Sequence, residues 1–435
     1  MRLPFLFLVA VAAMASCTVQ DNDRFYMPAE WEPHDAIWFG WEDDRLEYRP
    51  CVVNMIKTLK PHVKIKVAAS GDSLLRIAKK YLQQEGIDSL ELQFYDMKGD
   101  RYWIRDHGAA FLVNGNGELG VADFGWNTYG YPGWLEIKYN NNKDSVTKYL
   151  KLREPFMKRT GMVDSLMAVA ENAIILKTDI KHEGGAIEVN GKGTLILCEA
   201  TVLQRNPGLS KEQIELEFKR VLGVTKIIWM KKGLADDPLH FFRTISGNYV
   251  GGGTGGHTDE FVRFSNPTTI LLAWVDESEK DLNPVNKINY ERMSENLKIL
   301  EAAKDQDGNS FKIVKVPLPD LITRTVVAKE NSDPDADKPS PYLKPSYFPV
   351  TEAPAEGDSL IRVPAASYMN YLVTNGIVLL PTYTNAGSSA EKENEIRRIF
   401  TEQFPGREIV FIDAMPLNWS GGGIHCSTQQ QPRKK

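Results

Sequence analysis

Cysteine is scarce in this chain of 435 residues, which contains only Cys17, Cys51, Cys198 and Cys426. No two of them have C-x-x-C spacing, which argues against zinc ribbons and thioredoxin-like redox chemistry. Basic blocks are absent before the last three residues, and the formal net charge is −5, so no nucleic-acid partner is expected. Long apolar runs are absent after the first twenty residues, so no membrane-spanning helix is expected there.

The N-terminal residues have the pattern of an export signal. Arg2 precedes an apolar run, Leu3–Ala13, that is too short to cross a bilayer as a helix. The sequence Ala15-Ser16-Cys17 that follows resembles a bacterial lipoprotein box. We therefore expect residues 1–16 to be a signal peptide and Cys17 to carry a lipid anchor, which would be the only membrane contact. A plain secretory signal is the alternative, and both place the protein in the cell envelope or outside the cell.

The remainder, residues 24–433, is expected to form a single catalytic domain in which helices and strands alternate. Apolar residues at helical spacing predict helices, and Ser389 is a candidate N-cap for the last one. The predicted helices are Cys51–Leu59, Ser73–Glu85, Lys211–Leu222, Tyr290–Ala303 and Ala390–Phe404.

Four hairpins are built alike, each with two apolar runs joined by a short turn. Three of the turns contain Asn-Gly, a strong hairpin signal. A polar or glycine-rich motif precedes each hairpin, and a fifth motif lies near the C-terminus. The turns are at 114–117, 190–191, 265–267 and 375–376, and the motifs at 103–108, 183–185, 255–260, 364–370 and 421–426. Five such units predict an α/β fold, a five-bladed pseudosymmetric propeller with the motifs facing one central site. The alternative is an ordinary α+β sandwich.

Two segments do not fit the repeat of motif and hairpin. Lys231–Gly256 is rich in glycine but lacks the Lys-Ser/Thr of a phosphate loop, and we interpret it as a lid or loop. Ala328–Asp358 is rich in proline and charge, and we interpret it as a long surface loop.

The motifs carry one coherent set of chemical groups: Asp106, Glu183, His257, Asp259 and Cys426. Carboxylates match a planar guanidinium through paired hydrogen bonds, and a thiolate can attack its carbon once the charge is localised. His257 could protonate the departing ammonia and then activate a water molecule. This set predicts a nucleophilic cysteine enzyme that acts on guanidines.

Other interpretations remain open for the same residues. Each group alone could be structural, because a lone Cys is usually a small buried hydrophobe. His257, Asp259 and Glu183 could hold a metal ion, although no paired-His spacing is present. A non-catalytic lipoprotein that binds guanidines or polyamines is a further alternative, but it would not need the thiol.

Several stretches together resemble the agmatine deiminase family, which includes the bacterial peptidylarginine-deiminase-type enzymes of the guanidino-group-modifying superfamily. The stretches that carry the resemblance are Met27–His34, Trp103–Gly108, Glu183–Asn190, Gly256–Asp259, Phe404–Arg407 and Gly421–Pro432.

The resemblance implies a pentein-like five-bladed propeller and hydrolytic deimination without a metal or organic cofactor. It implies Cys426 as nucleophile, His257 as general acid and base, Asp106 and Asp259 as the guanidinium clamp, and Glu183 as a supporting carboxylate. Trp103 would lie against the guanidinium face, and Gly423 would also contact the substrate.

The expected reaction converts agmatine to N-carbamoylputrescine and ammonia. Free arginine or peptidyl-arginine, converted to citrulline, are the alternative substrates.

Overall fold

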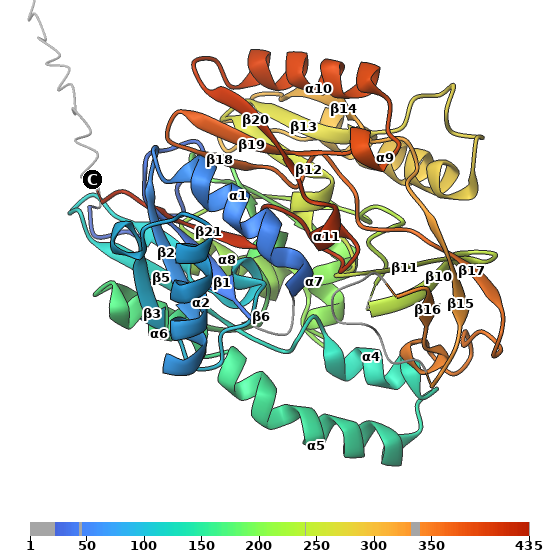
Figure 1. Cartoon of the computed structure of the whole chain (residues 1–435). Helices are drawn as coiled ribbons and strands as arrows, with labels where there is room; N and C mark the ends of the chain where they lie inside the picture. The colour runs from blue at the N-terminus through green and yellow to red at the C-terminus, as the bar shows by residue number, and fades with distance from the viewer. Residues whose placement is uncertain (1–21, 43–45, 240, 332–339, 435) are drawn as a thin grey trace, which may run out of the picture.

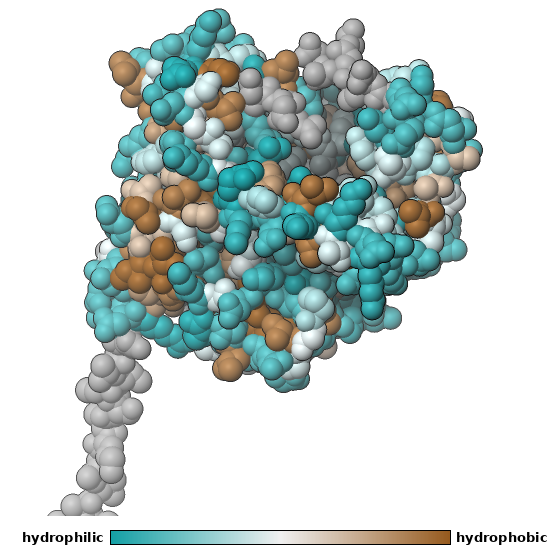
Figure 2. Space-filling view, turned by 90° about the horizontal axis from the view of Figure 1, so that it is seen from below, coloured by the Kyte–Doolittle hydropathy of each residue, from teal (hydrophilic) through white to brown (hydrophobic). Residues whose placement is uncertain are grey.

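The computed structural model describes residues 22–42, 46–239, 241–331 and 340–434. The predicted signal peptide, residues 1–16, and Cys17 lie outside these residues. Within them, no helix combines the length and apolar character needed to cross a bilayer. The face seen from below in Figure 2 is mostly hydrophilic, with hydrophobic side chains in a few separate groups.

The fold is α/β, and five small sheets share one strand pattern. In each, two strands pair antiparallel, and a third follows a helical connection and pairs parallel with the second. In sheet order they are β21 (Thr428–Pro432), β1 (His34–Trp41), β2 (Lys64–Ala69) and β3 (Gln93–Asp96); β4 (Ala110–Val113), β5 (Leu119–Gly125) and β6 (Ile174–Lys181); β7 (Glu188–Val189), β8 (Thr194–Cys198) and β9 (Lys226–Met230); β12 (Val262–Asn266), β13 (Thr269–Trp274) and β14 (Lys312–Pro317); β18 (Leu372–Thr374), β19 (Ile377–Thr382) and β20 (Glu408–Asp413).

The four predicted hairpins are confirmed, because each predicted turn joins two antiparallel strands of one sheet. The predicted helices are also confirmed, with shifted ends. The helix predicted from Tyr290 begins earlier, at Pro284, and the Ser389 side chain caps the last helix by accepting from the Lys392 N–H at 3.4 Å. The helices are α1 (Arg49–Leu59), α2 (Asp72–Gln84), α3 (Ile104–His107), α4 (Tyr131–Lys138), α5 (Lys143–Thr160), α6 (Val163–Ala170), α7 (Glu199–Arg205), α8 (Lys211–Leu222), α9 (Pro284–Ala302), α10 (Ala390–Gln403) and α11 (Met415–Asn418).

The interpretation of 231–256 as a loop is wrong in part, because two strands of this segment form a hairpin. Most of the described part of 328–358 lies outside strands, as predicted, but its first residue and one two-residue strand join the hairpin in a sixth sheet. The strand order of this sheet is β10 (Phe241–Ser246), β11 (Tyr249–Gly253), β17 (Ser359–Arg362), β15 (Arg324–Ala328) and β16 (Tyr342–Leu343). The pairing of β11 with β17 spans a long sequence separation, and neither segment shows strand periodicity by itself. Figure 1 shows this sheet at the right edge, apart from the helices α1 and α2.

The two ends of the described chain meet in one sheet. β21 pairs antiparallel with β1, so Thr428 lies opposite Phe39 and Gln430 opposite Ile37. The Gln431 side chain accepts from Trp38 Nε1 at 3.0 Å and from Lys66 Nζ at 2.9 Å. This buried pairing fixes the turn that leads into β21.

Candidate active site

The five predicted motifs each lie just before the first strand of one sheet. Three of them form single turns of helix, which are α3 before β4, η3 (Gly184–Ala186) before β7 and η4 (Thr258–Glu260) before β12. The other two are the turns before β18 and β21. η3 contacts both α3 and η4, so motifs distant in sequence converge.

Cys426 is buried in the turn before β21. Asn370 Nδ2 donates to Cys426 Sγ at 3.1 Å, and the sulfur lies 3.6 Å from Asp259 Oδ2. Burial, together with the carboxylates of Asp259 and Glu260, raises the pKa of the Cys426 thiol well above its usual value. The thiol is therefore protonated at neutral pH, and a bound cation would oppose that shift.

His257 is fully buried between two carboxylates. Its Nδ1 lies 3.5 Å from Asp106 Oδ1, and its Nε2 lies 3.4 Å from Glu183 Oε2. Burial lowers the pKa of His257, but Asp106, Glu183 and Asp259 outweigh it and raise the pKa to about 9. His257 therefore carries a proton at neutral pH and can donate it.

The carboxylates of Asp106 and Asp259 have different hydrogen-bond partners. Asp106 accepts from Tyr129 Oη at 2.8 Å and from the Gly185 N–H at 3.2 Å, and burial raises its pKa to about 6. Asp259 Oδ2 lies 2.7 Å from His425 Nδ1. Burial would raise the pKa of Asp259, but the nearby His425 and His257 lower it. Its other oxygen, Oδ1, is buried and has no hydrogen-bond partner among the described residues.

Glu183 is held by a buried arginine. Arg205 Nε donates to both oxygens of Glu183, at 2.9 and 3.2 Å. Burial would raise the pKa of Glu183, but Arg205 and His257 lower it to about 2. Glu183 thus keeps its negative charge beside the protonated His257.

Gly185 marks the point where these groups converge. A Cβ atom there would lie 2.7 Å from His257 Nδ1, 2.8 Å from Asp106 Oδ1 and 2.9 Å from Asp259 Oδ2. Any side chain at this position would collide with these three groups. Glycine is therefore the residue that lets the predicted clamp and His257 come together.

Trp103 and Gly423 both lie near Cys426, beside or within the turn that carries it. A Cβ on Gly422 would lie 2.8 Å from Trp103 Cζ3 and 3.2 Å from Cys426 Cβ, so Trp103 flanks the nucleophile. A Cβ on Gly423 would lie 2.6 Å from Asn370 Oδ1, so Gly423 leaves room for Asn370. Their contact with a substrate stays a prediction.

The loop that carries His257 is fixed by one carboxylate, Asp237. Its oxygens accept from the backbone N–H groups of Gly255, Gly256 and His257 at 3.1, 2.8 and 3.1 Å. Thr254 donates to the same carboxylate through its N–H and its hydroxyl. The β10–β11 hairpin lies between Asp237 and Thr254 in the sequence, so the hydrogen bonds between these two residues hold the two ends of the hairpin together.

Sequence reasoning missed several residues of the site. Asn370 ends the fourth motif as Cys426 ends the fifth, so the repeat could have identified it. Glu260 follows the predicted Asp259. His425 precedes Cys426 in the fifth motif, but nothing in the sequence pairs it with Asp259. No local signal marked the other supporting residues, which lie outside the predicted motifs: Tyr129, Arg205 and Asp237.

One group of side chains in the described part of the chain could hold a metal ion. Its members, Asp259, Glu260 and Cys426, offer ligand atoms within 4.8 Å of one another. The set differs from the predicted alternative of His257, Asp259 and Glu183. The hydrogen bonds from Asn370 to both the thiol and Glu260 already engage two of its members.

Comparisons of the sequence and of the structure with known proteins all find deiminases. Residues 26–432 match the Porphyromonas-type peptidyl-arginine deiminase family. The chain is 31% identical over 420 residues to an agmatine deiminase of Pseudomonas putida strain F1, covering 94% of this chain and 96% of the relative. A solved agmatine deiminase of Enterococcus faecalis has a TM-score of 0.70 at 24% identity, over 95% of this chain and 97% of that one. An agmatine deiminase of C. jejuni with substrate bound has a TM-score of 0.64 at 20% identity, covering 94% of this chain and 96% of that one.

Proposed function

The chain belongs to the Porphyromonas-type peptidyl-arginine deiminase family, and we propose that it hydrolyses a guanidino substrate to the ureido product and ammonia through a covalent bond to Cys426. The supporting observation is that the carboxylates of Asp106 and Asp259 and the imidazole of His257 converge at Gly185, with the Cys426 thiol 3.6 Å from Asp259. The name of the Pseudomonas relative makes agmatine the first substrate to test.

The first half of the reaction forms the covalent intermediate. Asp106 and Asp259 bind the guanidinium, whose positive charge favours loss of the Cys426 proton to solvent. The thiolate attacks the guanidinium carbon, and a C–S bond forms. His257 gives its proton to the leaving nitrogen, the C–N bond breaks, and ammonia departs. A cationic thiouronium remains on Cys426, and His257 is neutral.

The second half releases the product. His257 takes a proton from a water molecule, which attacks the thiouronium carbon, and a C–O bond forms. The C–S bond then breaks with its electrons on sulfur, and the hydroxyl proton of the new ureido group passes to solvent. His257 is again protonated, which Glu183 and Asp106 favour. The Cys426 thiolate and the released ammonia each take up a proton from solvent, which balances the two protons released earlier. The net change is guanidinium plus water to urea derivative plus ammonium.

The test is ammonia release by the purified mature protein with agmatine, L-arginine and a peptide containing arginine. We expect turnover of at least one of them, and none after Cys426→Ala or Cys426→Ser. Cys198→Ala is the matched control, since Cys198 is also buried but lies on β8 rather than in the nucleophile turn. Wild-type turnover in the Cys426 variants would refute the proposal.

Two alternative hypotheses, a metal-dependent hydrolase and a non-catalytic lipoprotein that binds guanidines, predict different results in the same assay. Iodoacetamide should abolish turnover by a thiol enzyme, and a chelator should spare it. A metal-dependent hydrolase would show the reverse. A protein that binds guanidines tightly but releases no ammonia would be a non-catalytic lipoprotein.

We further propose that the five sheets of common strand pattern are the blades of a pseudosymmetric propeller whose axis passes through the site. The shared position of the motifs before each sheet supports this arrangement. Export with a lipid at Cys17 is also a proposal. The mass of the mature N-terminal peptide from a bacterial host tests it, because an acylated Cys17 would head the peptide.

A further inference from the structure

His425, the residue before the predicted nucleophile, lies between two carboxylates. Its Nδ1 lies 2.7 Å from Asp259 Oδ2, and its Nε2 lies 2.9 Å from Glu30 Oε2. The His425 ring is buried, and the Glu30 side chain is 15% exposed. Glu30 is 395 residues away from His425 in sequence. An N-terminal and a C-terminal segment of the described chain thus meet at one member of the predicted clamp.

The two contacts of the His425 ring require an additional proton. A neutral imidazole has one N–H group and one lone pair, and an ionised carboxylate can only accept hydrogen bonds. Both distances are those of hydrogen bonds, so a second proton lies either on the ring or on one of the two carboxyl groups. Burial and two nearby arginines lower the pKa of His425. The carboxylates of Glu30 and Asp259 oppose this change, so Glu30 favours the ring that is hydrogen-bonded on both sides.

Glu30 is itself fixed by other contacts. Its Oε1 accepts from the Val373 N–H at 2.8 Å, and its Oε2 accepts from Arg263 Nη2. Arg263 is buried, and its Nε donates to Glu188 Oε2 at 2.7 Å. These contacts leave the Glu30 carboxylate little freedom to rotate, so it is a fixed partner for His425.

The contact with His425 makes the two oxygens of the Asp259 carboxylate unequal. Oδ2 is engaged by the ring, whereas Oδ1 is buried and has no hydrogen-bond partner among the described residues. A buried acceptor without a partner is costly, and a guanidinium N–H would satisfy it. Without the ring, the carboxylate could rotate about its Cβ–Cγ bond and exchange the two oxygens. The orientation of Asp259 therefore depends on His425, and the orientation of His425 depends on Glu30.

We propose that Glu30 is a positioning residue, which through His425 orients the Asp259 carboxylate so that Oδ1 receives the guanidinium. The inference rests on the proposed function and adds to it two residues that act through Asp259. It adds no step to the reaction, because no proton has to move between these groups during a turnover.

A double-mutant cycle tests the proposal on the purified protein, with the guanidine that it turns over best. In Glu30→Gln, which keeps the size of the side chain, kcat/KM should fall about 10- to 100-fold, because a charge-assisted contact is lost. His425→Gln should cause a similar or larger fall. Because Glu30 acts through His425, the double variant should lose no more than His425→Gln alone. Additive losses would overturn the proposal.

NMR of isotopically labelled histidines supplies a readout that a loss of stability alone would not move. The ring N–H signals of His425 are those that His425→Gln removes. We expect the signal of the proton bonded to Asp259 to move in Glu30→Gln, because the charge on the Glu30 side of the ring is lost. Unchanged ring signals in Glu30→Gln would overturn the proposal.

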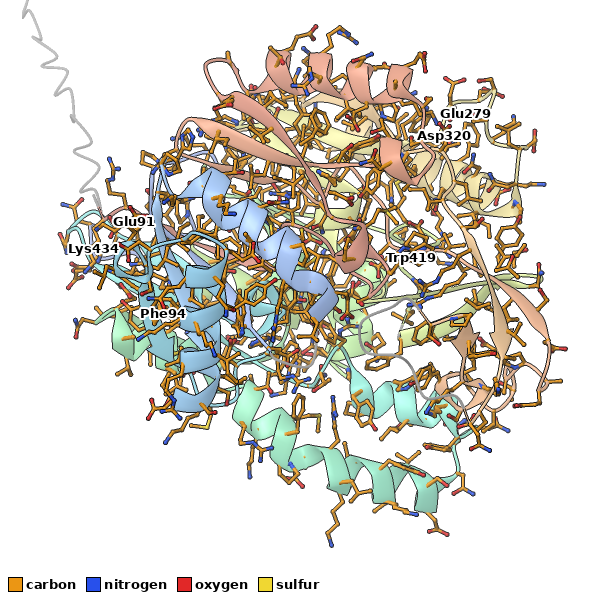
Figure 3. All side chains as sticks on the ribbon, in the orientation of Figure 1. Glu91, Phe94, Glu279, Asp320, Trp419 and Lys434 are labelled. Atoms are coloured by element: carbon orange, nitrogen blue, oxygen red, sulfur yellow. The ribbon has the colours of Figure 1, made fainter. Side chains whose placement is uncertain are left out.

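Glu279→Gln is the matched control, because Glu279 is also a partly buried glutamate in an ion pair, at 2.8 Å from Lys392. Figure 3 labels Glu279 at the outer edge of the molecule. Its substitution should leave kcat/KM within about 2-fold of wild type. If Glu30→Gln does not fold because Arg263 loses a partner, Glu30→Asp replaces it, since this carboxylate keeps its charge but is one methylene shorter. Absence of wild-type turnover on every guanidine would overturn the deiminase proposal instead, while the NMR signals would still show whether Glu30 controls His425.

Discussion

Gly185 is the residue whose missing side chain lets Asp106, His257 and Asp259 come together. We expect Gly185→Ala to lower kcat/KM at least about 100-fold, because its Cβ would lie within 2.9 Å of an atom of each of these side chains and displace them. Steady-state kinetics measure this loss.

Gly133→Ala is a suitable control, because a Cβ at Gly133 would approach only the movable Gln204 side chain. It should keep near-normal activity. Normal activity in Gly185→Ala would show that the substrate does not occupy the space beside His257.

The pH dependence of activity follows from two residues with raised pKa values. Asp106 must be ionised to bind the cation, so kcat/KM should rise as pH increases through about 6. His257 must be protonated to release ammonia once the bound cation has lowered the pKa of the Cys426 thiol, so kcat should fall as pH increases through about 9. A pH profile with a buffer series measures both limbs.

Asp106→Asn removes the group assigned to the acid limb. That limb should disappear while the remaining activity is very low, because a neutral amide cannot balance the cation. An unchanged acid limb in this variant would assign the lower pKa to a different group.

At the scale of elements, the hairpins and the supporting contacts differ in how far the sequence predicts them. The turn Asn190-Gly191 fixes a local geometry, so its hairpin was predictable. The sixth sheet depends on pairing between β11 and β17, which are far apart in sequence and lack alternation. Likewise, Cys426 and His257 stand in recognisable motifs, but the contact of Arg205 with Glu183 exists only after folding.

The loop between β11 and β12 carries His257, and the carboxylate of Asp237 holds this loop in place. Asp237→Asn keeps the size of the side chain but leaves fewer acceptors for the N–H groups of Gly255, Gly256 and His257. We expect kcat to fall about 10-fold or more and the alkaline limb of the pH profile to move, because His257 shifts relative to its carboxylates.

The neighbouring Asp236 provides the control, since its carboxylate accepts from Asn289 and not from the loop. Asp236→Asn should leave the alkaline limb in place. A lower melting temperature in Asp237→Asn with an unmoved pH profile would restrict Asp237 to a structural role.

For the whole molecule, the pairing of β1 with β21 joins the beginning and the end of the described fold. Gln431 links this sheet to Trp38 and Lys66 and donates to Glu171 at 2.8 Å. Gln431→Ala should lower the free energy of unfolding by about 2 kcal/mol, because buried donors lose their acceptor.

Urea denaturation followed by fluorescence measures the change. Gln83→Ala is the control, because Gln83 makes only an exposed hydrogen bond to Ser89, and it should change stability by less than about 0.5 kcal/mol. Equal effects of the two substitutions would contradict a special role for the joined ends.

The position of Cys426 just before β21 also has a consequence for synthesis. β1 is made early but meets its antiparallel partner only after the ribosome has passed all the other sheets. The motifs that carry Asp106, Glu183, His257 and Asp259 therefore emerge before the nucleophile does. A chain cut before Cys426 would contain the carboxylates and His257, but neither the thiol assigned as nucleophile nor the strand that completes the first sheet, so we expect it to show no turnover.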